Sequence, residues 1–124
     1  MTDLTELADR VEALEGPCRE VDALIWDALG LVSESHCRLW CRMDGRTDVT
    51  RAMFLAAWSP EYTASLDAAM ALVPVQSLDK VTIQTFGGPG PMALVYPNER
   101  FCSAATPALA LCAAALRARE TLAP

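Results

Sequence analysis

Aromatic and arginine side chains gather in the middle third of this sequence. The set comprises Trp40, Phe54, Trp58 and Tyr62 together with Arg38, Arg42, Arg46 and Arg51. Aromatic rings stack on nucleobases, and guanidinium groups form paired hydrogen bonds with phosphate oxygens. The mixture therefore suits a nucleotide-like ligand. The alternative is that the rings lie in a core or a dimer interface and that the arginines are solvated.

A candidate ligand site can be assembled from part of this set. Its residues are Trp58, Tyr62, Thr63, Arg42 and Arg51. Tyr62 and Thr63 precede a predicted helix, whose first N–H groups can receive an anion. Trp58 lies four residues upstream, across Pro60, so its ring could lie beside that helix start. Asp67 opposes the hypothesis, because an acid in the first turn competes with an anion for the positive end of the helix dipole.

Metal binding and catalysis have less support. His36, Cys37 and Cys41 form the grouping that most suggests a metal, but structural zinc sites usually contain two closely spaced cysteine pairs, and only one is present. The lone histidine has no partner pattern for nucleophilic catalysis. We therefore predict no metal, no cofactor and no enzymatic activity. The five cysteines are an odd number without a disulfide framework, so we expect free thiols.

The glycine-rich stretch at residues 87–91 does not have the character of a phosphate-binding loop. No Gly-Lys-Ser/Thr follows it, and two prolines remove N–H groups that a phosphate would need. We interpret it as a loop between two strands.

The charge is unevenly distributed along the chain. The formal net charge is −6, and residues 1–34 contain nine acidic residues against two arginines. An acidic chain is poorly suited to bind a phosphate backbone over a broad face, so we expect no direct nucleic-acid binding. The acidic segment could instead occupy a basic groove on another protein, or it could be a solvated helical face.

Hydrophobic spacing predicts the elements that must position these residues. Helices are predicted at residues 2–15, 18–29 and 63–73 and from Thr106 onward, and strands at 78–86, 92–96 and 101–104. Residues 39–43 alternate as a strand does, whereas residues 50–58 fit a strand or a short helix. Thr63 is the expected N-cap of the third helix, and Thr106 with Pro107 forms the clearest helix start in the chain. The order of elements predicts an α+β fold: a small antiparallel β-sheet with packed helices, resembling an α-β-α sandwich.

With 124 residues the chain has the size of one domain. The N-terminal helix (1–16) could lie at its periphery, and residues 120–124 should fray. Charged residues or prolines interrupt every apolar run, so no membrane span is predicted. The acidic N-terminus does not have the pattern of a signal peptide, and we expect a cytoplasmic protein.

Three stretches resemble a known group of proteins. These are Arg19–Leu24 in a helix that ends at a glycine, Tyr62–Ala69 (YTASLDAA) and Ala105–Leu116 (ATPALALCAAAL). They are similar to small proteins of tailed phages and prophages, of the phage ABA-sandwich domain type. The resemblance covers under half of the chain. It implies helices packed on a β-sheet and a phage origin, and it implies no particular reaction.

Small non-catalytic phage proteins often counteract host defences, and this class analogy supplies the functional hypothesis. We expect a homo-oligomeric sponge that sequesters a nucleotide second messenger of the host bacterium. A second hypothesis is an acidic inhibitor that binds a host defence protein, such as a nuclease or effector. A third is a phage structural or assembly accessory protein.

Overall fold

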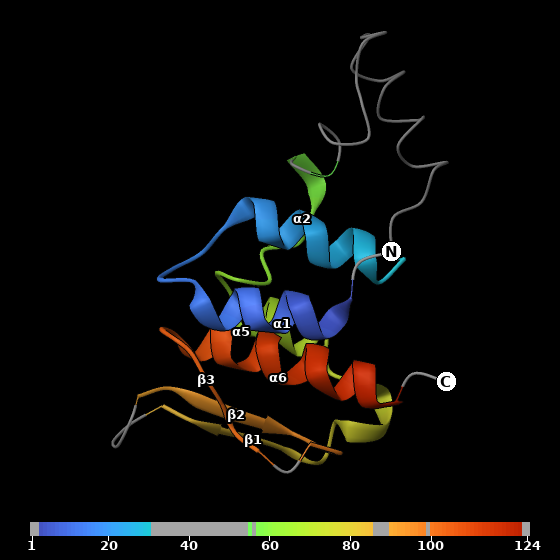
Figure 1. Ribbon diagram of the computed structural model, residues 1–124, viewed down its shortest axis with the longest axis vertical. Coiled ribbons are helices and arrows are strands. Elements are labelled where there is room, and N and C mark those ends of the chain that lie inside the picture. Colours follow the sequence, from blue (N-terminus) through green and yellow to red (C-terminus); the bar gives the residue numbers. More distant parts are fainter. Residues whose placement is uncertain (1–2, 31–54, 56, 86–89, 99, 123–124) are drawn as a thin grey trace, which may run out of the picture.

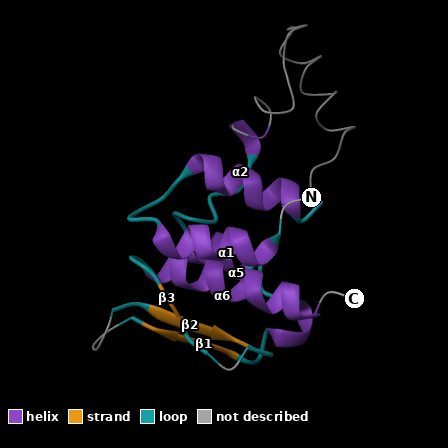
Figure 2. Cartoon of the chain, viewed as in Figure 1, coloured by secondary structure: helices purple, strands orange, loops and turns teal. Residues whose placement is uncertain are grey.

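The computed structural model describes residues 3–30, 55, 57–85, 90–98 and 100–122 (Figure 1). Its helices are α1 (Leu4–Ala13), α2 (Arg19–Ala28), α5 (Leu66–Met70) and α6 (Pro107–Leu122), with a short 3₁₀ helix, η1, at Val75–Ser77. Its strands are β1 (Val81–Gln84), β2 (Met92–Val95) and β3 (Cys102–Ser103), in the antiparallel order β1-β2-β3. Packed helices beside a small antiparallel sheet confirm the predicted α+β class (Figure 2).

Helix α6 forms the centre of the fold. It contacts the three strands as well as α1 and α5, and α2 lies beyond α1 (Figure 1). Ten of its sixteen residues are buried: Ala108, Leu109, Ala110, Leu111, Cys112, Ala113, Ala114, Ala115, Leu116 and Ala118. A helix that is apolar around most of its circumference is a core helix rather than a surface helix. The face of α6 that carries Leu109 and Leu116 is therefore buried, and the opposite face is buried as well.

The sheet lies against α6 through alternate residues of its central strand. Ala93 and Val95 are fully buried, whereas Met92 and Leu94 are partly exposed. In the pairing of β1 with β2, Val81 lies opposite Val95. This period of two is the pattern expected for a strand with one face on the core.

The helix ends follow the predicted capping chemistry at three places. The Thr106 hydroxyl accepts the Leu109 N–H at 3.2 Å, and Pro107 is the first residue of α6, where its missing N–H costs nothing. The Asp3 carboxylate caps α1 by accepting the Thr5 N–H at 2.9 Å. Gly30 follows α2 with φ of 69°, a left-handed conformation that glycine adopts without strain.

The helix predicted from Thr63 to Val73 is shorter than expected. Its observed counterpart α5 begins at Leu66, and its N-cap is Ser65, whose hydroxyl accepts the Ala68 N–H at 3.2 Å. Thr63 cannot cap a helix because its side chain bonds elsewhere, as described below. The predicted strand 78–86 is also shorter, since η1 and the turn closed by Lys80 N–H on the Ser77 carbonyl precede it.

Both ends of the chain are more structured than the sequence pattern indicates. Leu7, Ala8 and Val11 of α1 are buried in the same core as α6, so α1 belongs to the central packing. Residues 120–122, which were expected to fray, continue α6. The strand predicted at 39–43, most of 50–58 and most of the loop 87–91 lie outside the described residues.

Candidate functional site

Of the sequence-predicted site residues, the structure describes Trp58, Tyr62 and Thr63, and it does not place these three at one open surface. Trp58 is 56% exposed, whereas Tyr62 is 3% exposed and Thr63 is fully buried. Arg42 and Arg51 lie outside the described residues. A ligand surface at Trp58 with these arginines stays a prediction, and Tyr62 and Thr63 contribute no open surface to it.

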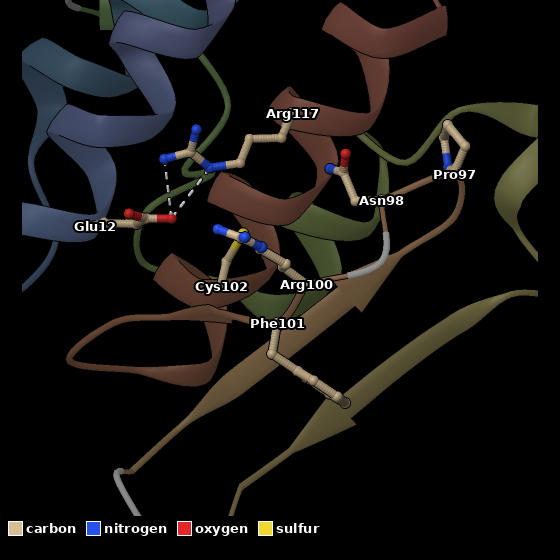
Figure 3. A pocket seen from close by; sticks show the side chains of 7 residues that line it. All are labelled: Glu12, Pro97, Asn98, Arg100, Phe101, Cys102 and Arg117. Carbon is tan, nitrogen blue, oxygen red and sulfur yellow. Dashed lines mark hydrogen bonds and ion pairs between the residues drawn. The ribbon is translucent and has the colours of Figure 1, made fainter.

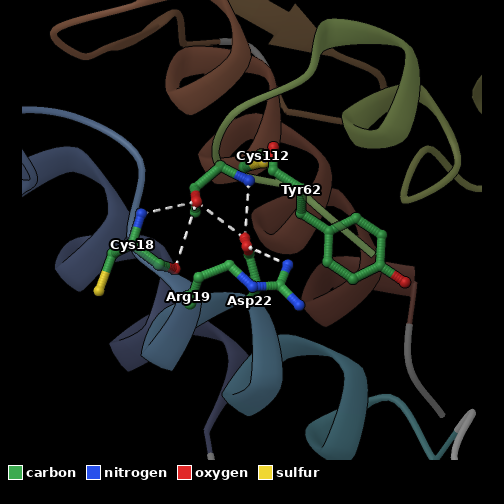
Figure 4. Close-up of polar contacts among 6 residues, drawn as sticks. Cys18, Arg19, Asp22, Tyr62 and Cys112 are labelled. Carbon is green, nitrogen blue, oxygen red and sulfur yellow. Dashed lines mark hydrogen bonds and ion pairs between the residues drawn. The ribbon is translucent and has the colours of Figure 1, made fainter. Parts of the chain in front are cut away.

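Thr63 is the centre of a closed polar network with Asp22, Cys18 and Arg19 (Figure 4). Its N–H and its hydroxyl each lie 2.8 Å from Asp22 Oδ1, and its hydroxyl oxygen accepts the Cys18 N–H at 2.9 Å. Arg19 donates to the other oxygen of the Asp22 carboxylate at 3.1 Å. Thr63 itself therefore offers no free N–H group to an anion, and anion binding by the first N–H groups of the following helix stays a prediction. The Thr63 N–H already bonds a buried carboxylate, which would also repel an anion.

Tyr62, next to Thr63, also joins segments that are distant in sequence. Its backbone carbonyl accepts a hydrogen bond from the Cys112 thiol of α6 at 2.9 Å. Burial raises the pKa of Tyr62, while Arg119 opposes this and Asp22 adds to it. Burial also raises the pKa of the Cys112 thiol to about 12. Both groups are thus neutral at pH 7, as core residues are.

A hollow with a different character lies where the β2–β3 connection meets α6 and α1 (Figure 3). We call it the Arg100 pocket. It has a volume of about 580 Å³ and is lined by Glu12, Pro97, Asn98, Arg100, Phe101, Cys102 and Arg117. Its polar side chains come from α1, α6 and the connection itself, so the core packing described above sets their relative positions.

Arg117 forms the back of this pocket and is held by two carboxylates of α1. Its Nε and Nη2 each lie 3.2 Å from Glu12 Oε1, and Nη2 also donates to Asp9 Oδ1. Burial lowers the pKa of Arg117, but the bonds to Asp9 and Glu12 outweigh this and raise it. The guanidinium is therefore a permanent cation that is already neutralised in part.

Arg100 differs from Arg117 in having no ion-pair or hydrogen-bond partner among the described residues. It is exposed, and in Figure 3 its side chain extends toward the Glu12–Arg117 pair. Phe101, which is 42% exposed, points away from that pair over the sheet in the same view. The pocket thus has a cationic side and an aromatic side.

Asn98 supplies a further group that the described part of the chain leaves unsatisfied. Its Nδ2 atom is buried and has no acceptor there, while its Oδ1 lies 3.3 Å from the Thr121 hydroxyl that donates to it. Buried amide donors are rarely left without an acceptor.

Cys102 lines the pocket but is a weak nucleophile. Burial raises its pKa to about 11, the Glu12 carboxylate adds to the rise, and Arg117 opposes it. At pH 7 the thiol is protonated, and the thiolate is the reactive form. The described residues contain no group of three or more His, Cys, Asp or Glu side chains that could hold a metal ion. The chemistry that the pocket offers is recognition of an anion.

Sequence reasoning interpreted residues 97–100 as a turn and did not select the pocket. A local signal existed in Arg100 followed by Phe101, a cation and a ring in a short connection between two strands. The rest had no local signal, because Glu12 and Arg117 meet across 105 residues of sequence.

Comparison with protein-family models, curated proteins and solved structures finds no match for the chain. The similarity to the phage ABA-sandwich group therefore stays a prediction, resting on the three stretches of sequence. No helix among the described residues has both the length and the apolar character needed to cross a membrane.

Proposed function

We propose that this protein is a non-catalytic binding protein that holds a nucleotide-like anion in the Arg100 pocket. The observation that carries the proposal is the guanidinium of Arg100, which has no partner in the described part of the chain and lies at the rim of a hollow of about 580 Å³. Small-molecule sites typically have volumes of about 300–1,000 Å³, so the hollow has room for one nucleotide.

The two sides of the pocket match the two ends of a nucleotide. Arg100 offers donors to a phosphate, and charge-assisted bonds to phosphate are among the stronger hydrogen bonds in proteins. The exposed Phe101 ring offers a stacking surface for the base, a contact that contributes about 1–3 kcal/mol per base. The neutral Cys102 thiol favours binding without a covalent step.

The biological part of the proposal is that the protein is a phage-encoded counter-defence factor. In the host bacterial cytoplasm it would sequester a nucleotide immune signal and release it unmodified. This part is supported by the resemblance to small phage proteins and by class analogy. It requires only tight binding, which the pocket could provide without catalytic groups.

A titration tests the proposal. Purified protein is screened against cyclic and linear nucleotides by melting shift, and binding is then measured by calorimetry for the wild type and Arg100→Gln. We expect Arg100→Gln to weaken binding at least tenfold, because hydrogen bonds to charged groups contribute about 1.5–3 kcal/mol.

The matched control is Arg10→Gln, which alters another exposed arginine, paired with Glu20 on the far side of α1 from Arg117. This variant should bind like the wild type. Chromatography of the ligand after denaturation should recover it unchanged. Binding that is indifferent to Arg100→Gln, or conversion of the ligand to a product, would contradict the proposal.

The acidic surface of α1 and α2 favours a second candidate, an inhibitor that binds a basic groove on a host nuclease or effector. Six acidic side chains of this region are exposed: Asp3, Glu6, Asp9, Glu15, Glu20 and Asp27. Such a protein would form a heterocomplex whose affinity falls with salt. The pocket hypothesis predicts a small ligand instead, so size-exclusion chromatography with a candidate target distinguishes the two.

The proposal includes a homo-oligomer, which would form through a surface separate from the Arg100 pocket. Val75 is 82% exposed, and it lines a smaller hollow of about 290 Å³ together with Leu122 and Arg119. A contiguous apolar surface of this kind would be the part of the molecule that a second copy covers. Sedimentation velocity should show a species larger than the monomer that Val75→Asp reduces to a monomer. A monomeric wild type at all concentrations would contradict it.

A further inference from the structure

We infer that the Arg100 pocket selects nucleotides whose phosphate carries a single negative charge, that is phosphodiesters, over phosphomonoesters and polyphosphates. The inference rests on the proposed function and concerns which ligand class that site takes. It follows from how the charges around the pocket are already paired.

Among the described residues, the charged side chains that line the pocket have a net charge of +1. They are Arg100, Arg117 and Glu12. Glu12 Oε1 accepts from both Nε and Nη2 of Arg117, so these two charges compensate each other. Arg100 remains as the one uncompensated cation among the described lining residues. A phosphodiester, with one negative charge, matches it.

A second negative charge on the ligand would meet opposition rather than support. The Glu12 carboxylate lines the same pocket and is only 30% exposed, so solvent screens it incompletely. Asp9 binds Arg117 from a more exposed position and strengthens the local negative potential. A phosphomonoester carries about −1.5 to −2 charges at pH 7, and a triphosphate carries more.

Glu12 cannot easily move away from an incoming phosphate. It lies on α1, whose residues Leu7 and Val11 are buried in the core against α6. Arg117 on α6 holds its carboxylate in place. The negative charge is therefore a fixed feature of the pocket wall, which is the arrangement required for discrimination by repulsion.

The number of free cations points to the same ligand class. One free guanidinium among the described lining residues suits a phosphate that needs few charge-neutralising partners. Sites for polyphosphates usually add several cations or a metal ion to the phosphate oxygens.

Calorimetry with three ligands that share one base tests the inference. The probes are a 3′,5′-cyclic mononucleotide, the corresponding 5′-monophosphate and the corresponding 5′-triphosphate. Because the base is common, differences in affinity report the phosphate. At pH 7.5 the cyclic mononucleotide should bind at least about fivefold more tightly than either of the others, a ratio equivalent to about 1 kcal/mol.

Two further arms identify charge as the cause. Glu12→Gln removes one charge with little change in shape, and it should bring the ratio between cyclic and 5′-monophosphate close to one. Lowering the pH to 5.2 should also reduce the ratio for the wild type, because the second pKa of a phosphomonoester is about 6 and the cyclic ester does not titrate there. The pH arm remains informative if Glu12→Gln does not fold.

The outcomes separate the two claims. Tighter binding of the 5′-monophosphate or triphosphate at pH 7.5, or a preference that neither Glu12→Gln nor low pH reduces, overturns the inference and leaves the proposed function intact. Absence of nucleotide binding, or binding that Arg100→Gln does not weaken, overturns the proposed function and the inference with it.

Discussion

The Asp22–Thr63 network and the Arg100 pocket are both polar, and both join segments far apart in sequence, but they differ in how completely their groups are satisfied. At Thr63 both the N–H and the hydroxyl have partners within the chain. The buried Asp22 carboxylate accepts from Thr63 through one oxygen and from Arg19 through the other. At the pocket, the exposed Arg100 guanidinium has none in the described residues. The first region therefore has a structural role, and the second retains hydrogen-bonding capacity for a ligand.

Asp22→Ala should have the largest effect on stability. It removes the acceptor of the buried Thr63 N–H, and the Thr63 hydroxyl keeps only the Cys18 backbone as partner. Hydrogen bonds to a charged group contribute about 1.5–3 kcal/mol, so we expect a loss of about 3 kcal/mol in the free energy of unfolding. Urea denaturation measures it, with Glu15→Gln as an exposed acidic control expected to change little. A stable Asp22→Ala would show that the network does not hold the fold.

Thr63→Val should destabilise the same network to a smaller extent. The variant keeps the shape and the N–H bond to Asp22 but loses the hydroxyl that joins Asp22 to Cys18. We expect a loss of about 1–2 kcal/mol, measured in the same denaturation experiment. Nucleotide affinity should stay unchanged, because Thr63 is buried away from the pocket lining. Loss of affinity in a folded Thr63→Val protein would revive the predicted site around Trp58.

The buried thiols predict a pH dependence of smaller size. Burial raises the pKa of Cys102 to about 11 and that of Cys112 to about 12, above the ordinary value of 9.0. The folded state thus binds these protons more tightly than the unfolded state. The resulting stability is fully present below pH 9 and is lost as the pH rises toward 11–12. Denaturation at pH 8, 9 and 10 should show falling stability, with a smaller slope in Cys112→Ala.

Arg100→Gln should have the smallest effect on stability while having the largest effect on binding. An exposed cation without a partner in the described chain contributes little to the fold, so we expect a change within about 0.5 kcal/mol. If this variant were destabilised as strongly as Asp22→Ala, the contrast between a structural network and a ligand pocket would be wrong. Differential scanning calorimetry of both variants side by side makes the measurement.

The sequence was a good guide to the elements and a poor guide to the site, for physical reasons. Local signals such as the Thr106–Pro107 start and the apolar run at residues 92–96 correctly located α6 and β2. Amphipathic spacing did not show that α6 is buried almost all round, because alanine is compatible with both a core and a surface. Thr63 looked like a helix cap, and only the distant Asp22 decides otherwise.

The pocket depends on long-range contacts in the same way. Arg117 was interpreted as a charge near the C-terminal end of a helix, and Glu12 as part of an acidic face. Arg117 Nε lies 3.2 Å from Glu12 Oε1 because α1 packs on α6, and local sequence patterns do not encode that packing. Arg42 and Arg51 lie outside the described residues, so the arginine part of the predicted site stays a prediction.

Mapping of backbone amide shifts by two-dimensional NMR tests the central claim most directly. With ¹⁵N-labelled protein and a saturating 3′,5′-cyclic mononucleotide, the largest perturbations should fall on Asn98, Arg100, Phe101, Cys102 and Arg117, which line the pocket. The amides of Tyr62 and Thr63 should remain unperturbed. Perturbations centred on Trp58, Tyr62 and Thr63, with none at the pocket, would contradict the account.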